Sequence, residues 1–182
     1  KEILKGSRSR HSILNGHPGP LLPGVLVPTG PMGQGICTAE GFALAGRGDS
    51  GFDVFALTGD GELQEGTVWE AVMYSGAIGL DNFCVMVDRN RGQLDNPYDN
   101  VFPMKEPGDQ FKAFGYRVMQ VNGSEYKQIV SALREFKYGA RDGRPTAIII
   151  NCRKGEGSFN AEFIKHKTTL IPAPVQKKIF LQ

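Results

Sequence analysis

Two polar residues, Asp60 and Asn90, stand where their side chains could bind one cation together. Asp60 follows the apolar run 54–57, and Asn90 follows a second apolar run at 83–87. If the two runs are neighbouring parallel strands, their carboxyl ends lie side by side. A carboxylate oxygen and an amide oxygen would then meet, and ligands of this kind suit a hard cation such as Mg²⁺.

Gly59 and Gly61 flank Asp60 and predict a tight turn whose backbone N–H groups can approach an anion closely. The helix that follows would present its positive end to the same anion. A P-loop is excluded because no Lys-Ser/Thr pair follows the turn. We therefore expect a phosphate site with a built-in carboxylate. The simpler alternative is that Asp60 only caps the next helix and Asn90 only serves a turn.

These residues need a sheet to position them, and the chain alternates predicted strands with predicted helices. Strands are expected at 52–58, 83–88, 116–121 and 146–152, and helices at 33–45, 64–79, 109–114 and 125–138. Residues 1–35, after a short helical start, and 91–107 are expected to be loops. The alternation favours an α/β fold, a doubly wound, mostly parallel sheet with helices on both faces and ligands at the carboxyl ends of its strands.

Length and composition suit a single globular domain. The chain has 182 residues, of which 40% are hydrophobic and 22% charged, so we expect one domain over residues 1–182. The absence of an initiator Met predicts a domain that is incomplete at its N-terminus, and residues 153–182 are expected to form an irregular tail. A net charge of +2 gives no basic field for nucleic acid, and no apolar run reaches the ~20 residues of a membrane helix.

The cysteines favour a cytoplasmic protein. Cys37, Cys84 and Cys152 are odd in number and form no CxxC motif. Two of them lie in or beside predicted strands, so we expect buried thiols in a reducing compartment.

Several segments together resemble one enzyme family. The stretch GDGELQEGTVWEA with VDRN is similar to the diphosphate-binding domain of thiamine-diphosphate enzymes, and to transketolase in particular. The segments Gly16-His17-Pro18, PTGPMGQG at 28–35 and PTAIIINCRKGEGSF at 145–159 resemble further transketolase segments in the same order. The resemblance covers nearly all of residues 10–160 and is more specific than any single motif.

The resemblance implies a cofactor and its metal. Thiamine diphosphate would bind through Mg²⁺, or another divalent cation such as Ca²⁺ or Mn²⁺. Asp60, the Asn90 side chain and the backbone carbonyl of Gly92 would hold the metal, and Gly61 would donate its N–H to the diphosphate.

The resemblance also implies roles around the cofactor's rings and the substrate. Gly30, Pro31 and Met32 would line the rings, and His17 would face the substrate and help to move protons or hold hydroxyls. His166 would contact the diphosphate; its alternative is an ordinary histidine of an exposed tail.

A partner is implied as well. Glu65 and Glu70 match acidic positions at a subunit interface that the family links to cofactor activation, although both could be ordinary exposed helix glutamates. A pyrimidine-binding domain or C-terminal transketolase subunit would complete the site in a homo- or hetero-oligomer. The assembly would transfer a two-carbon ketol unit between sugar phosphates, as in the pentose phosphate pathway, and this chain alone would not turn over.

Two other functions stay open from the sequence. One is another thiamine-diphosphate enzyme component, either the alpha subunit of a 2-oxo acid dehydrogenase or a deoxyxylulose-phosphate synthase. Those enzymes usually carry other segments in place of VDRN and GPMGQG. The second is a non-catalytic binding module that retains the fold.

Overall fold

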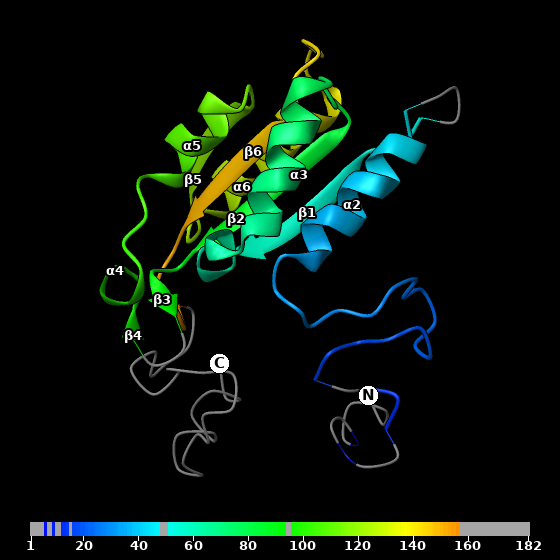
Figure 1. Cartoon of the computed structure of the whole chain (residues 1–182), viewed down its shortest axis with the longest axis vertical. Coiled ribbons are helices and arrows are strands. Elements are labelled where there is room, and N and C mark those ends of the chain that lie inside the picture. The colour runs from blue at the N-terminus through cyan, green and yellow to red at the C-terminus, as the bar shows by residue number, and fades with distance from the viewer. Residues whose placement is uncertain are drawn as a thin grey trace.

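A four-stranded parallel sheet forms the centre of the molecule (Figure 1). The computed structural model describes residues 6, 9, 12–14, 16–47, 51–93 and 96–156. The sheet has the order β1-β2-β6-β5, and its strands are β1 (Val54–Gly59), β2 (Phe83–Arg89), β6 (Thr146–Asn151) and β5 (Arg117–Asn122). β2 and β6 are therefore the central strands. Their apolar sequences fit burial on both faces.

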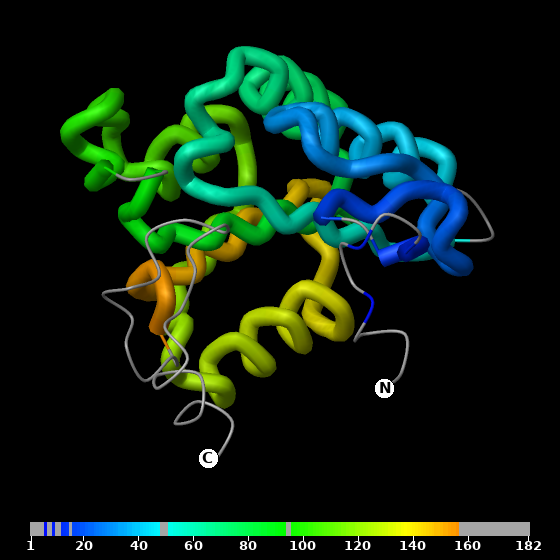
Figure 2. Tube along the Cα trace, turned by 90° about the horizontal axis from the view of Figure 1, so that it is seen from below, coloured from blue at the N-terminus to red at the C-terminus, as the bar shows by residue number. Residues whose placement is uncertain are grey.

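Helices cover both faces of the sheet, which confirms the expected α/β class (Figure 2). On one face lie α2 (Gln34–Ala45), α3 (Gly66–Ala77) and the shorter α5 (Pro107–Ala113). α6 (Tyr126–Tyr138) packs on the opposite face. Each helix follows a strand or leads into one, as the alternating sequence pattern predicts.

The core is divided by the sheet into two clusters. The larger one joins the sheet to α2, α3 and α5, and it includes Val72, Phe83 and Phe111, each fully buried. The smaller one lies under α6 and includes Cys84 and Phe136. Successive strand residues point to opposite faces, so each central strand feeds both clusters.

Two segments differ from the sequence prediction. The helix expected at 64–79 is a 3₁₀ turn, η1 (Gly61–Gln64), followed by α3, because Glu65 between them adopts an extended conformation with φ −77° and ψ 130°. The expected loop at 91–107 contains a small antiparallel pair, β3 (Gly92–Gln93) and β4 (Asn96–Pro97), and a single helical turn, α4 (Tyr98–Val101). Both features lie beside Asp60 or Asn90 in the sequence.

In the described part of the chain, no helix is long and apolar enough to span a membrane. All three cysteines are free thiols, with Cys84 buried and Cys37 and Cys152 half-buried. Of the expected tail, only residues 153–156 lie within the described residues, and they form a turn.

Candidate functional site

The backbone ladder of the sheet continues past the ends of β1, β2 and β6 and ties three loops together. Asp60 N donates to the Asp88 carbonyl at 3.1 Å, on the β1 side of β2. On its other side, Cys152 N donates to the Arg89 carbonyl at 3.1 Å and Lys154 N to the Asn90 carbonyl at 3.3 Å. The structure thus brings the GDG, DRN and CRK segments to one edge of the sheet.

Asp60 is the buried carboxylate of this edge, with only 2% of its surface exposed. One carboxylate oxygen accepts from Gly61 N at 2.8 Å, and the other from Arg91 N at 2.7 Å. Burial raises the pKa of Asp60, and the two backbone hydrogen bonds partly oppose this shift. Arg91 has φ 58°, and this left-handed conformation belongs to the turn that directs its N–H at the carboxylate.

Asn90 lies next to this contact and holds the same turn. Its Oδ1 accepts from Gly92 N at 2.9 Å, while its Nδ2 donates to an Asp88 carboxylate oxygen at 3.0 Å. Asp60 and Asn90 therefore do serve a cap and a turn, the simpler roles considered from the sequence. Each of the three accepting oxygens, the two of the Asp60 carboxylate and Asn90 Oδ1, keeps a further lone pair, so cation binding stays compatible with these roles.

The donor set suits a hard cation whose ligands come largely from amide, backbone and cofactor oxygens. Among the described residues, no group of three or more His, Cys, Asp or Glu side chains is placed to hold a metal. A cation at Asp60 would therefore take its other ligands from Asn90, a backbone carbonyl and phosphate oxygens, which is how Mg²⁺ commonly binds. Gly92 suits this crowded place, because a Cβ there would lie 2.6 Å from Lys154 Cδ.

Glu62 connects this edge to the loop that precedes α2, a role not anticipated from the sequence. One of its carboxylate oxygens accepts from Gly33 N at 2.7 Å, and the other from Gly59 N at 3.4 Å. Gly33 has φ 81°, so a side chain at this position would be strained. Glu62 thereby fixes the PTGPMGQG loop against the GDG turn.

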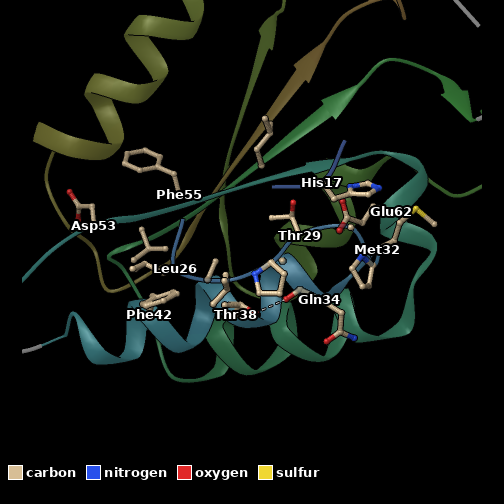
Figure 3. Close-up of a pocket in the computed structure, with 18 of the residues that line it drawn as sticks. His17, Leu26, Thr29, Met32, Gln34, Thr38, Phe42, Asp53, Phe55 and Glu62 are labelled. Carbon is tan, nitrogen blue, oxygen red and sulfur yellow. Dashed lines mark hydrogen bonds between the residues drawn. The ribbon is translucent and has the colours of Figure 1, made fainter. Parts of the chain in front are cut away.

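A hollow of about 660 Å³ opens beside this loop (Figure 3). His17 and Glu62 lie at one end of it, together with Met32, and apolar side chains from α2 and β1 lie at the other. The His17 ring packs on Gly30, where a Cβ would come within 3.2 Å of the ring. Gly30 and Pro31 also line the hollow, so the structure gathers the residues expected around the cofactor's rings and the substrate.

The remaining expected site residues are more dispersed. Glu65 is the half-buried N-cap residue of α3, whereas Glu70 is exposed on that helix. His166 lies outside the described residues. No site role was predicted for Asp88, Cys152 or Lys154, although all three stand in the segments VDRN and CRKGEG that resemble transketolase.

Comparison with known proteins gives a consistent picture. Residues 2–176 match the family model "Transketolase, thiamine diphosphate binding domain". The chain is 35% identical over 147 residues to one of the subunits of the apulose-4-phosphate transketolase of Phocaeicola vulgatus, with 80% of this chain and 52% of that protein covered. It is 34% identical over 155 residues to 6-deoxy-6-sulfo-D-fructose transketolase subunit SqwG of a Clostridium species, with 80% of this chain and 56% of that protein covered.

Solved structures agree with this assignment. The transketolase of Campylobacter jejuni superposes with a TM-score of 0.80 at 29% identity, over 98% of this chain and 32% of that one. The chain thus spans about half the length of the two transketolase subunits that it resembles and about a third of the Campylobacter jejuni transketolase chain. With a family model matched over most of its length, the chain belongs to the transketolase family, as its thiamine-diphosphate-binding domain.

Proposed function

We propose that this chain is the thiamine-diphosphate-binding and Mg²⁺-binding component of a transketolase whose site is completed by a pyrimidine-binding domain or subunit. The observation that carries the proposal is the ladder joining Asp60, Asn90 and Lys154 at one sheet edge. The resemblance to two proteins that are themselves named as transketolase subunits favours a partner on a separate chain. A cytoplasmic location is proposed with it.

Asp60, the Asn90 amide oxygen and the Gly92 carbonyl would hold the cation. In the structure Gly61 N–H donates to Asp60, so it would be shared with the diphosphate when the cofactor binds. The Lys154 side chain lies over Gly92 and adds a positive charge suited to the same diphosphate. His166 is proposed as a further diphosphate contact.

Gly30, Pro31 and Met32 would line the cofactor's rings, and His17 would face the substrate from the hollow. An imidazole suits this place, because it can exchange a proton or hold a hydroxyl near neutral pH.

Bound thiamine diphosphate would supply the carbanion for transfer of a two-carbon ketol unit from a ketose phosphate to an aldose phosphate. The names of the two related subunits suggest unusual sugars, one a sugar phosphate and the other a sulfosugar.

The partner would cover the outer side of α2 and α3, near Glu65 and Glu70. These two helices carry one charged residue each, Glu40 and Glu70. The side chains of Met73 and Tyr74 are about half exposed on α3. A helix that is apolar around most of its circumference is normally covered on more than one side.

Titration with thiamine diphosphate, with and without Mg²⁺, tests the proposal. The single tryptophan reports on the site, because Trp69 Nε1 donates to the Leu63 carbonyl in the turn after Asp60, at 2.6 Å. We expect Mg²⁺-dependent binding seen in Trp69 fluorescence, and its loss in Asp60→Ala with the thermal unfolding transition retained. Absence of metal-dependent binding, even with a C-terminal transketolase subunit present, would refute the proposal. Unchanged affinity in Asp60→Ala would reject the metal site.

A further inference from the structure

The amide of Asn90 is held at both of its ends. Its Nδ2 donates to an Asp88 carboxylate oxygen at 3.0 Å, and its Oδ1 accepts from Gly92 N at 2.9 Å. These two contacts differ in kind, because the first needs a donor from the amide and the second needs an acceptor. The environment of Asn90 therefore distinguishes its oxygen from its nitrogen.

Asp88 is itself held from a third segment. Its other carboxylate oxygen accepts from the Cys152 thiol, with 2.7 Å between Oδ1 and Sγ. Asp88 comes two residues after Met86, and Cys152 two residues after Ile150. Side chains two residues apart on a strand point to the same face, so both lie on the α6 side of the sheet, where Met86 and Ile150 pack. The backbone keeps them together, since Cys152 N donates to the Arg89 carbonyl at 3.1 Å. A chain of hydrogen bonds thus runs from Cys152 through Asp88 to Asn90.

Rotating the Asn90 amide by half a turn would break both contacts. The amide oxygen would then face a carboxylate, which can only accept hydrogen bonds when ionised, and the NH₂ group would face the N–H of Gly92. Two like partners at hydrogen-bonding distance repel each other, and a buried polar group without a partner costs about 1–3 kcal/mol. The observed orientation turns the oxygen away from Asp88 and towards Gly92.

We propose that Asp88, held by the Cys152 thiol, is a positioning residue that keeps the Asn90 amide oxygen directed at the cation site. The inference rests on the proposed function, in which that oxygen is a ligand of the cation. Asp88 does not touch the cation in this scheme. It acts through Asn90, in the way that outer hydrogen-bond partners orient metal ligands in other proteins.

The experiment compares Asp88→Ala and Cys152→Ala with wild type in Mg²⁺-dependent binding of thiamine diphosphate. Asp88→Ala removes the acceptor, and we expect its dissociation constant to rise roughly 10- to 100-fold. Cys152→Ala removes only the outer donor and should weaken binding less. Cys152→Ser retains a hydroxyl donor and should restore binding to within about twofold of wild type. Asp88→Leu, which keeps most of the side-chain volume and has no acceptor, should raise the dissociation constant similarly and covers the case in which Asp88→Ala does not fold.

Asn122→Ala is the matched control. Asn122 also stands at a strand end, but its Oδ1 accepts from Ser124 N at the exposed end of β5. We expect cofactor binding by this variant to stay within about twofold of wild type. Thermal unfolding of every variant separates a loss of fold from a loss of orientation.

A second readout needs no cofactor. The side-chain NH₂ resonances of Asn90, assigned by their loss in Asn90→Asp, should be shifted in the wild-type apo protein and move towards free-amide values in Asp88→Ala. Unchanged resonances, or binding by Asp88→Ala within about twofold of wild type, would overturn the inference alone. Wild-type protein without Mg²⁺-dependent binding would overturn the proposed function, and the inference with it.

Discussion

The helices on the two faces of the sheet differ most on the sides that they turn away from it. α6 gathers its apolar residues on one side and carries Lys127, Arg134, Glu135 and Lys137 elsewhere. α2 and α3 have no such division, and each carries a single charged residue. The pattern of α6 is that of a helix with one side in the core and the other in water. The pattern of α2 and α3 is that of helices with contacts on more than one side.

The difference teaches where an assembly would form. The hollow with His17 and Gly30 opens beside α2, and Glu65 begins α3, so the charge-poor layer is continuous with the candidate site. A partner that covers this layer would reach the site as well. The α6 side also reaches the hollow, through Phe55, whose ring packs on Phe136, but the outer surface of α6 is that of an ordinary amphipathic helix.

The largest expected effect tests whether the core clusters on the two faces of the sheet contribute equally to stability. Phe111 of α5 and Phe136 of α6 are both buried, and they belong to the core clusters on opposite faces of the sheet. Phe111→Ala and Phe136→Ala should each lower the free energy of unfolding by about 3–5 kcal/mol, because each leaves a cavity in a closed core. Chemical denaturation measures both. A cost below about 1 kcal/mol for Phe136→Ala would show that the α6 side is not a closed core.

A smaller effect is expected on the outer surfaces. Tyr74 on α3 is 50% exposed and Tyr138 at the end of α6 is 77% exposed. Tyr74→Lys should weaken the association with the partner by about 2 kcal/mol, as expected for an aromatic interface residue, while Tyr138→Lys leaves it unchanged. Sedimentation velocity on the purified assembly measures association. Equal behaviour of the two variants would remove the distinction between the faces.

The smallest expected effect concerns the one charged residue of α2. Burial raises the pKa of the Glu40 carboxyl, which lies near Ser75 of α3, above its ordinary value of 4.5. The folded state therefore keeps a proton that the unfolded state has lost, and stability falls as the pH rises from the ordinary pKa through the raised one. Glu40→Gln should raise the unfolding temperature near pH 7 and leave it nearly unchanged below the ordinary pKa.

Glu135→Gln on α6 is the matched control. Its exposed carboxylate pairs with Arg117 at 3.3 Å, so removing its charge should lower stability by at most about 1 kcal/mol. A pH-independent change in Glu40→Gln, or the same change in both variants, would contradict the assigned difference between the two layers.

Much of this architecture could be predicted because its signals are local. The apolar runs at 54–57, 83–87 and 146–150 are strands, and the apolar stripe of 125–138 is α6, which begins one residue later than expected. Family resemblance then supplied the identity of the domain, which the family model confirms. The roles of Asp60, Asn90 and the other site residues stay predictions.

The missed features depend on contacts between distant segments. Glu62 reaches Gly33 across 29 residues, and Cys152 reaches Asp88 across 64, so no local pattern marks either contact. The break before α3 was missed for a different reason. Glu65 is a good helix former by propensity, yet its extended backbone lets η1 end and α3 begin.

The alternation of side chains at the end of β2 makes the site sensitive to the spacing of the chain. Asp88 faces Cys152 on the α6 side, while the next residue, Arg89, turns to the other face and pairs with Glu106 at 2.7 Å. A shift of β2 by one residue would put a guanidinium in place of the carboxylate that orients Asn90. Single-residue insertions in the short turn 78–82 should therefore be far less tolerated than insertions between β3 and β4, and natural length variation should concentrate after the site rather than before it.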